Sequence, residues 1–204
     1  ESSQKQSFVA CIANLYGFLT ASSTTIANMK ETIIQSMNLR EFASYQNGSL
    51  VNDFSKPDTN TSIGSYKKDA LYGEMDMKDS AQKIYFNNVV NAYRNFCDFL
   101  RSDTDIDYTY LWDIICTPND RLFITGLNLI VLEIPEDDIT ANVKLICPTN
   151  AYSTNNFVRD RPTFIVFKKS DFFEPIFVYN SDTQEQIRVF TAPYKKEPRH
   201  IRRI

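Results

Sequence analysis

The sequence predicts an α+β fold in which N-terminal helices pack on a C-terminal sheet of five mainly antiparallel strands. Apolar residues repeat at helical spacing as far as Pro118, and β-branched and aromatic runs bounded by turn residues follow Gly126. The polar connectors between those runs are short for crossover helices, which favours antiparallel neighbours. Since the chain has 204 residues and 43% of them are hydrophobic, it can bury one sizeable core. We expect a single domain over residues 1–194 and a basic tail or linker over 195–204.

Helical periodicity begins near the N-terminus. The first helix is predicted by an apolar stripe made of Phe8, Ile12, Leu15, Tyr16 and Leu19. Thr25 can cap a second helix that runs to Met37. A short third helix ends at Gln46, because Asn47 and Gly48 form a typical stop signal.

A polar surface loop is expected over residues 55–78, after an apolar patch at 49–54. Pro57 interrupts regular structure near its start, and Asp, Thr, Asn, Ser, Gly and Lys predominate. Four larger side chains could instead dock this segment on the sheet or on a partner: Tyr66, Leu71, Tyr72 and Met75.

The helical period returns after this loop. The longest predicted helix covers 79–100, with Asp79 or Ser80 as its cap. A further helix begins after the cap Asp107 and ends before Pro118.

Five strands are expected from the C-terminal apolar runs, at 128–134, 142–147, 163–169, 175–180 and 186–191. The core should combine residues of both parts: Phe8, Ile12, Leu15, Val89, Phe96, Leu129, Val131, Leu145, Ile165 and Phe167.

The residues available for chemistry disfavour an enzyme. The chain holds one histidine, His200, and it lies in the basic tail. Because neutral imidazole is the usual general base near pH 7 and the commonest metal ligand, a body without histidine loses most nucleophile–base pairs and zinc sites. The four cysteines, Cys11, Cys97, Cys116 and Cys147, form no CxxC pair, and the five glycines form no phosphate-binding loop. We expect no metal and no cofactor, and free thiols in a reducing intracellular compartment, with a structural disulfide as the alternative.

Charge is unevenly distributed along the chain. The net charge of −3 divides into +4 on the last ten residues and −7 on the rest. The cations of the tail are Lys195, Lys196, Arg199, Arg202 and Arg203. This tail is either a nucleic-acid-binding arm or, as we favour, a connector to a further domain, since the chain starts at Glu1 without an initiator Met. No apolar run approaches the ~18–20 residues that span a bilayer, so no membrane contact is expected.

Several stretches resemble known proteins. Residues 7–16 (SFVACIANLY) and 112–134 resemble the nucleophile-bearing helix and the Trp-containing segment of ovarian-tumour-type (OTU) cysteine proteases, and 173–179 lies where that family has its His-Tyr strand. More of the chain is similar to a segment of large multidomain proteins of nucleocytoplasmic large DNA viruses, or giant viruses. The similar stretches are QNGSLV at 46–51, LWD at 111–113, GLNLI at 126–130, ICPTN at 146–150 and FEPI at 173–176.

The OTU resemblance implies a papain-like outline but departs at the catalytic positions. Ser7 stands where the nucleophilic Cys would be, and Glu174, Pro175 or Ile176 stands where the His would be. A Ser without an adjacent base is a poor nucleophile. The resemblance therefore implies a catalytically silent OTU-like domain, a pseudoenzyme, that acts in protein–protein interaction or assembly.

The viral resemblance implies a setting for that role. The domain would serve viral transcription or particle machinery in the host cytoplasm, a viral factory or the virion, with a viral or host protein as its partner, ubiquitin-like proteins included. Two alternatives stay open: an active OTU-like cysteine protease or deubiquitinase that uses Cys11 and His200, and a nucleic-acid-binding module that uses the tail.

Overall fold

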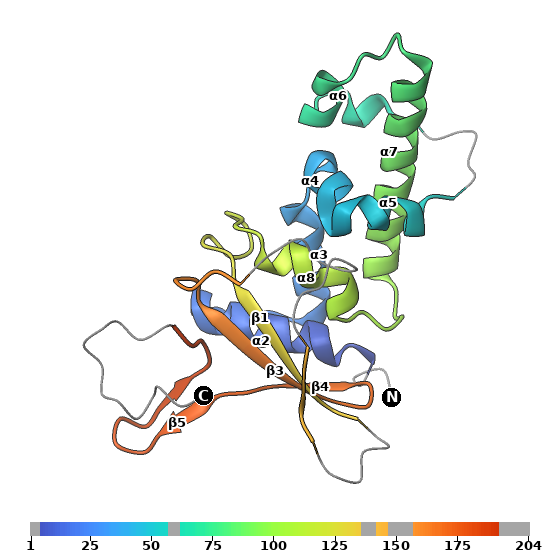
Figure 1. Cartoon of the computed structure of the whole chain (residues 1–204). Helices are drawn as coiled ribbons and strands as arrows, with labels where there is room; N and C mark the ends of the chain where they lie inside the picture. Colours follow the sequence, from blue (N-terminus) through green and yellow to red (C-terminus); the bar gives the residue numbers. More distant parts are fainter. Residues whose placement is uncertain (1–4, 57–61, 136–141, 147–156, 192–204) are drawn as a thin grey trace.

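The helices come first in the chain and the strands follow. The computed structural model describes residues 5–56, 62–135, 142–146 and 157–191, and within them the predicted α+β class is confirmed (Figure 1). The helices are α2 (Ser7–Thr20), α3 (Ile26–Ser36), α4 (Leu39–Ser44), α5 (Ser49–Phe54), α6 (Ala70–Glu74), α7 (Ser80–Arg101) and α8 (Tyr108–Cys116), with 3-10 turns at Tyr45–Gly48 and Gly64–Tyr66.

Three predicted helix starts are confirmed at the capping residue. The Thr25 hydroxyl accepts a hydrogen bond from the backbone N–H of Asn28 at 3.1 Å. The Asp79 carboxylate accepts one from the N–H of Ala81 at 2.8 Å, and Asp107 has the same role at the start of α8. Each cap satisfies an N–H group that has no partner within its own helix.

The long helix α7 is the centre of the helical part. Helices α3, α4 and α5 all contact it. The Phe96 ring lies 5.5 Å from that of Phe42 and 4.9 Å from that of Phe54, measured between ring centroids. The side chains of α7 that are buried in this core are Phe86, Val89, Val90, Ala92, Phe96, Cys97 and Leu100. Their three- and four-residue spacing produces the single apolar side that packs against three other helices.

The segment expected to be a polar loop is partly helical and partly packed. Residues 62–78 contain α6, and Leu71 is buried against the helical core. The Tyr72 ring contacts Phe86 at 5.3 Å between centroids, and Asp69 accepts a hydrogen bond from the N–H of Leu39. A few large apolar residues therefore dock a segment that is otherwise polar, and they dock it on helices rather than on the sheet.

The strands form two separate sheets. A four-stranded sheet has the order β2-β1-β3-β4, and β5 pairs with β6 in a second sheet of two strands. The strands are β1 (Asn128–Ile134), β2 (Lys144–Ile146), β3 (Thr163–Lys169), β4 (Phe172–Pro175), β5 (Val178–Asn180) and β6 (Glu185–Ile187). The predicted bounds of β1 and β3 are confirmed to the residue, whereas the expected strand at 175–180 divides between β4 and β5.

The pairing differs from the single, mainly antiparallel sheet of five strands that the connectors predicted. β1 pairs antiparallel with β2 on one edge and parallel with β3 on the other, while β3 pairs antiparallel with β4. Since β2 reverses the chain once and the next connection reverses it again, β3 runs in the same direction as β1. Short connectors predict reversals of direction, but they do not say which edge of an existing pair the next strand joins.

One face of the four-stranded sheet is covered by helices. Helix α2 packs against β4 and helix α8 against β1. The covered face consists of Leu129, Val131, Ile146, Phe164, Val166 and Phe173, and all six side chains are buried. Figure 1 shows α2 lying along the sheet. Helix α8 and the other helices lie toward one end of the sheet.

Candidate functional site

The cysteines in the described part of the chain are free, buried thiols. Cys11 in α2 is 3% exposed, and burial, with a smaller effect of the Glu174 charge, raises its pKa to about 12. Burial likewise raises the pKa of Cys97 to about 11 and that of Cys116 to about 12. Because the thiolate is the nucleophilic form, burial and the raised pKa values disfavour reaction of these three thiols near pH 7.

The start of helix α2 and strand β4 lie side by side. The Ser7 hydroxyl accepts a hydrogen bond from the backbone N–H of Phe173 at 3.0 Å and donates one to the carbonyl of Asp171 at 3.4 Å. The Phe8 ring packs on that of Phe173 at 5.2 Å between centroids. Ser7 therefore ties α2 to β4, and its hydroxyl is engaged by backbone groups.

Some predicted site residues lie outside the described residues. These are Cys147, His200 and the five cations of the tail, Lys195, Lys196, Arg199, Arg202 and Arg203. A pair formed by Cys11 and His200, and nucleic-acid binding by the tail, therefore stay predictions. Among the described helices, none is long and apolar enough to cross a membrane.

The second face of the four-stranded sheet is apolar, and none of the described helices covers it. We name it the open face; its members are Ile130, Leu132, Ile134, Leu145, Ile165, Phe167 and Phe172. Leu132 lies between Leu145 and Phe167 in the pairing register, and Ile130 lies beside Ile165. None of the seven is buried, and Leu145 and Phe172 are 55% and 41% exposed. Leu145, Ile165 and Phe167 were expected in the core, and the structure corrects that expectation.

The hairpin of β5 and β6 exposes further apolar side chains. Val178 and Ile187 face each other in the pairing register, and both are exposed. Arg188, just after β6, fastens the hairpin to α2: its guanidinium donates to the Asn14 side chain and lies 5.2 Å from the centroid of the Phe18 ring. The C-terminal part of the chain thus presents apolar surface on two neighbouring elements.

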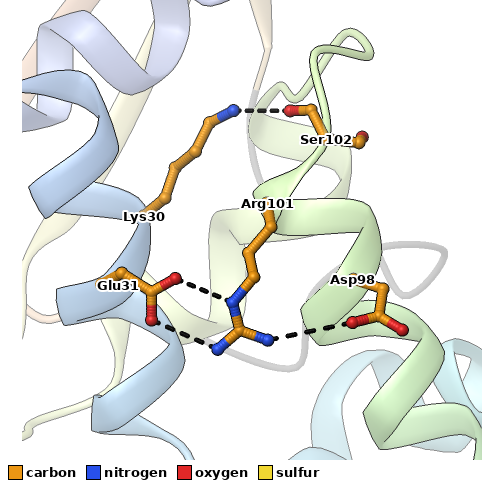
Figure 2. A network of polar contacts seen from close by, with 5 residues as sticks. All are labelled: Lys30, Glu31, Asp98, Arg101 and Ser102. Atoms are coloured by element: carbon orange, nitrogen blue, oxygen red, sulfur yellow. Dashed lines mark hydrogen bonds and ion pairs between the residues drawn. The ribbon is translucent and has the colours of Figure 1, made fainter.

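A polar pocket lies where the start of α3 meets the end of α7. Figure 2 shows the charged groups at this junction. Arg101 donates two hydrogen bonds to Glu31, at 2.8 and 3.2 Å, and its Nη1 lies 3.8 Å from Asp98. This bidentate pair holds α7 to α3 and lowers the pKa of Glu31.

Lys30 is the unusual residue of this junction. Only 7% of its surface is exposed, and its Nζ donates to the carbonyl of Ser102 at 2.6 Å (Figure 2). Burial lowers the pKa of the ammonium, and the negative charge of Asp103 partly opposes that effect. The sequence signal was a charged residue within the apolar stripe of α3, four residues after Ile26 and four before Ile34.

Comparison with known proteins adds no relative. No protein-family model, no curated protein sequence and no solved structure matches the chain.

Proposed function

We propose that the chain is a protein-binding domain without catalytic activity of its own, and that it binds its partner through the open face. The observation that carries this proposal is the register of seven apolar side chains on one sheet face, none of which is buried. Monomeric proteins rarely expose contiguous apolar patches larger than a few hundred Å², and larger patches mark interaction sites. Lys169 and Glu174 stand in the same rows of the sheet, so an apolar protein surface with a charged rim is the complementary partner.

The proposal includes the wider setting that the resemblances imply. In it the domain is OTU-like in outline, belongs to a protein of a large DNA virus, and binds a viral or host protein, ubiquitin-like proteins included. The buried, protonated state of the Cys11 thiol supports a non-catalytic role. The free thiols support a reducing compartment.

Site-specific crosslinking tests the open face. A photo-crosslinking amino acid is placed at Leu145 on the open face and, as a matched control, at Ile84 on α7, which is 60% exposed. We expect a discrete protein to be captured at Leu145 in the cells that produce the chain, and not at Ile84. Equal capture at both positions, or none at Leu145, contradicts the proposal.

Binding to the purified partner then tests affinity. Leu145→Asp should weaken the complex by about tenfold or more, because it places a charge within the apolar surface of the interface. The control Ile84→Asp should leave the dissociation constant unchanged. If the two variants bind the partner with equal affinity, the open face is not part of the interface.

Two further assays test the alternatives. A ubiquitin-based electrophilic probe should leave the cysteines unmodified, and stoichiometric capture by Cys11 would establish a hydrolase instead. Deleting 195–204 should not change binding to nucleic acid near physiological salt. A tail-dependent affinity with a log–log salt slope of about −3 to −5 would establish a nucleic-acid module.

A further inference from the structure

The open face carries one charge of each sign beside its apolar side chains. Lys169 on β3 pairs in register with Phe172, and Glu174 on β4 pairs with Phe167, so both charged side chains belong to this face. Both are exposed, and within the described part of the chain neither takes part in an ion pair. A partner that matches this face therefore offers an acidic group to Lys169 and a basic group to Glu174.

Two apolar residues repeat the spacing of these two charges. Glu174 stands one strand and two residues away from Lys169, and Leu145 stands one strand and two residues away from Ile130. Because β1 and β3 are parallel and in register, the two diagonals are parallel lines on the face, and their midpoints are two strands and two residues apart. With about 4.8 Å between strands and about 6.8 Å for two residues, the line through the midpoints is perpendicular to both diagonals.

A two-fold axis along that line makes the face complementary to itself. A second copy turned about this axis sets its Glu174 over Lys169 and its Leu145 over Ile130, and each contact occurs twice. The axis passes close to Leu132 and Phe167, so these side chains pack against their own counterparts. Such self-complementarity is what a closed two-fold dimer requires.

The size of the face suits a weak dimer. Its charged and apolar members occupy three paired rows across four strands, which is roughly 400 Å² on each copy at the strand and residue spacings of a sheet. Two such faces together bury roughly 800 Å², which is at the low end for a specific contact. Two sheets can pack face to face about 10 Å apart, with the side chains of both inner faces interdigitated. We therefore expect a dimer that forms reversibly and depends on protein concentration.

The outer edge of β4 does not offer an equivalent contact. β4 is an edge strand of the four-stranded sheet, and the backbone N–H of Phe173 donates to Ser7 Oγ at 3.0 Å. A strand added at this edge would have to displace the Ser7 hydroxyl. Contact through the face requires no such exchange.

We propose that a second copy of this chain covers the open face, in a two-fold contact in which Lys169 of each copy pairs with Glu174 of the other. This inference rests on the proposed function, because it names the partner of the same face. The two sheets become the inner layers of the dimer, and helices α2 and α8 of each copy form its outer layers.

Sedimentation equilibrium of the purified chain tests the dimer. From low micromolar to millimolar concentration, the average mass should rise from one chain toward two. Leu145→Asp should raise the dissociation constant by about tenfold or more, and the control Ile84→Asp should not change it. One chain at every concentration overturns this inference, and the proposed function then stands only if a crosslinker at Leu145 captures a different protein in cells.

Charge reversal tests the assigned pairs. Lys169→Glu places two acidic groups at each contact and Glu174→Lys places two basic groups there, so either variant alone should dimerise about tenfold more weakly or worse. An equal mixture of the two variants should recover the affinity of the parent chain, because each contact of a mixed dimer again joins Lys and Glu.

A matched pair of variants controls for overall charge. Lys83→Glu on α7 and Asp53→Lys on α5 make the same charge changes at exposed positions outside the open face. Alone or mixed, they should leave the dissociation constant of the dimer unchanged. No recovery in the mixture of open-face variants, or equal effects of the control variants, overturns the two-fold arrangement.

Discussion

The helical part and the open face use similar apolar side chains in different ways. In α7, Phe86, Val89 and Phe96 are completely enclosed by neighbouring helices. On the open face, Phe167 and Ile165 lie in register with apolar neighbours, and yet all of them keep contact with solvent. Folding free energy therefore comes mainly from the helices and the covered face of the sheet. The open face contributes less to stability, which is the property expected of a surface that is completed by a partner.

The two faces of β3 offer the sharpest test of this difference. Phe164 is 1% exposed on the covered face, while Phe167 is half-buried on the open face. Phe164→Ala should lower the free energy of unfolding by about 3–5 kcal/mol, through lost transfer energy and the cavity left behind. Phe167→Ala should lower it by only about 1 kcal/mol. Urea unfolding of both variants checks the pair, and equal losses would mean that the open face belongs to the core.

The link between helix α8 and strand β1 should be nearly as sensitive to substitution. Gly126 follows α8 and precedes β1, with a φ of +68°, and a Cβ atom built there would lie 2.4 Å from the carbonyl oxygen of Cys116. Gly126→Ala should therefore destabilise the chain by about 3 kcal/mol, through a left-handed backbone and a clash with backbone that cannot move cheaply. Gly73→Ala in α6 is the control, since it meets open space and should stabilise slightly. If Gly126→Ala left the free energy of unfolding unchanged, the junction between α8 and β1 would be loosely packed.

The segment that contains α6 should behave as part of the helical core. Leu71 is buried there, so Leu71→Ala should cost about 2 kcal/mol in urea unfolding. Ile84→Ala on the exposed side of α7 should stay within about 0.5 kcal/mol of the parent chain. If Leu71→Ala left the free energy of unfolding unchanged, residues 62–78 would be a surface loop that adds nothing to the core.

Alkaline pH should destabilise the fold through its buried thiols Cys11, Cys97 and Cys116, which lie on α2, α7 and α8. Their pKa values are raised from 9.0 to about 12, 11 and 12. Between pH 9 and 11 the unfolded thiols lose protons that the folded thiols keep, so the free energy of unfolding falls as pH rises. The slope for each thiol approaches about 1.4 kcal/mol per pH unit as its limit, at a pH well above the unfolded and well below the folded pKa. Urea unfolding at several pH values measures it, and Cys97→Ala should reduce the slope by one thiol's share. A flat profile would contradict the burial of the thiols.

Much of the local structure could be predicted from the sequence, whereas the pairing could not. β1 and β3 were bounded by turn residues and built from apolar runs, and the caps Thr25, Asp79 and Asp107 marked helix starts. Which edge of β1 receives β3 depends on contacts between residues far apart in the chain. Strand periodicity also says which residues share a face, but not whether a helix covers that face, and so Leu145 was expected in the core.

The polar pocket between α3 and α7 was less accessible to prediction than the fold. Lys30 could have been noticed as a charge within an apolar stripe of α3. Gln6, which also lines this pocket, carried no such signal, because the orientation of its amide depends on Thr104, 98 positions away. The position of Asp103 relative to Lys30 depends on how α7 ends against α3, which no local pattern specifies.

The hydrogen bond between Ser7 and Phe173 has a consequence for synthesis on the ribosome. These residues are 166 positions apart, so translation at about 5–20 residues per second places roughly ten to thirty seconds between them. During that interval α3, α4 and α5 can assemble on α7, since their contacts are made within the first half of the chain. Phe8, whose ring packs on Phe173, must wait for β4. Helix α2 precedes the other described helices in the chain, and yet its side toward the sheet is enclosed only after β4 has been made, so apolar residues such as Phe8 stay open to chaperones during that interval.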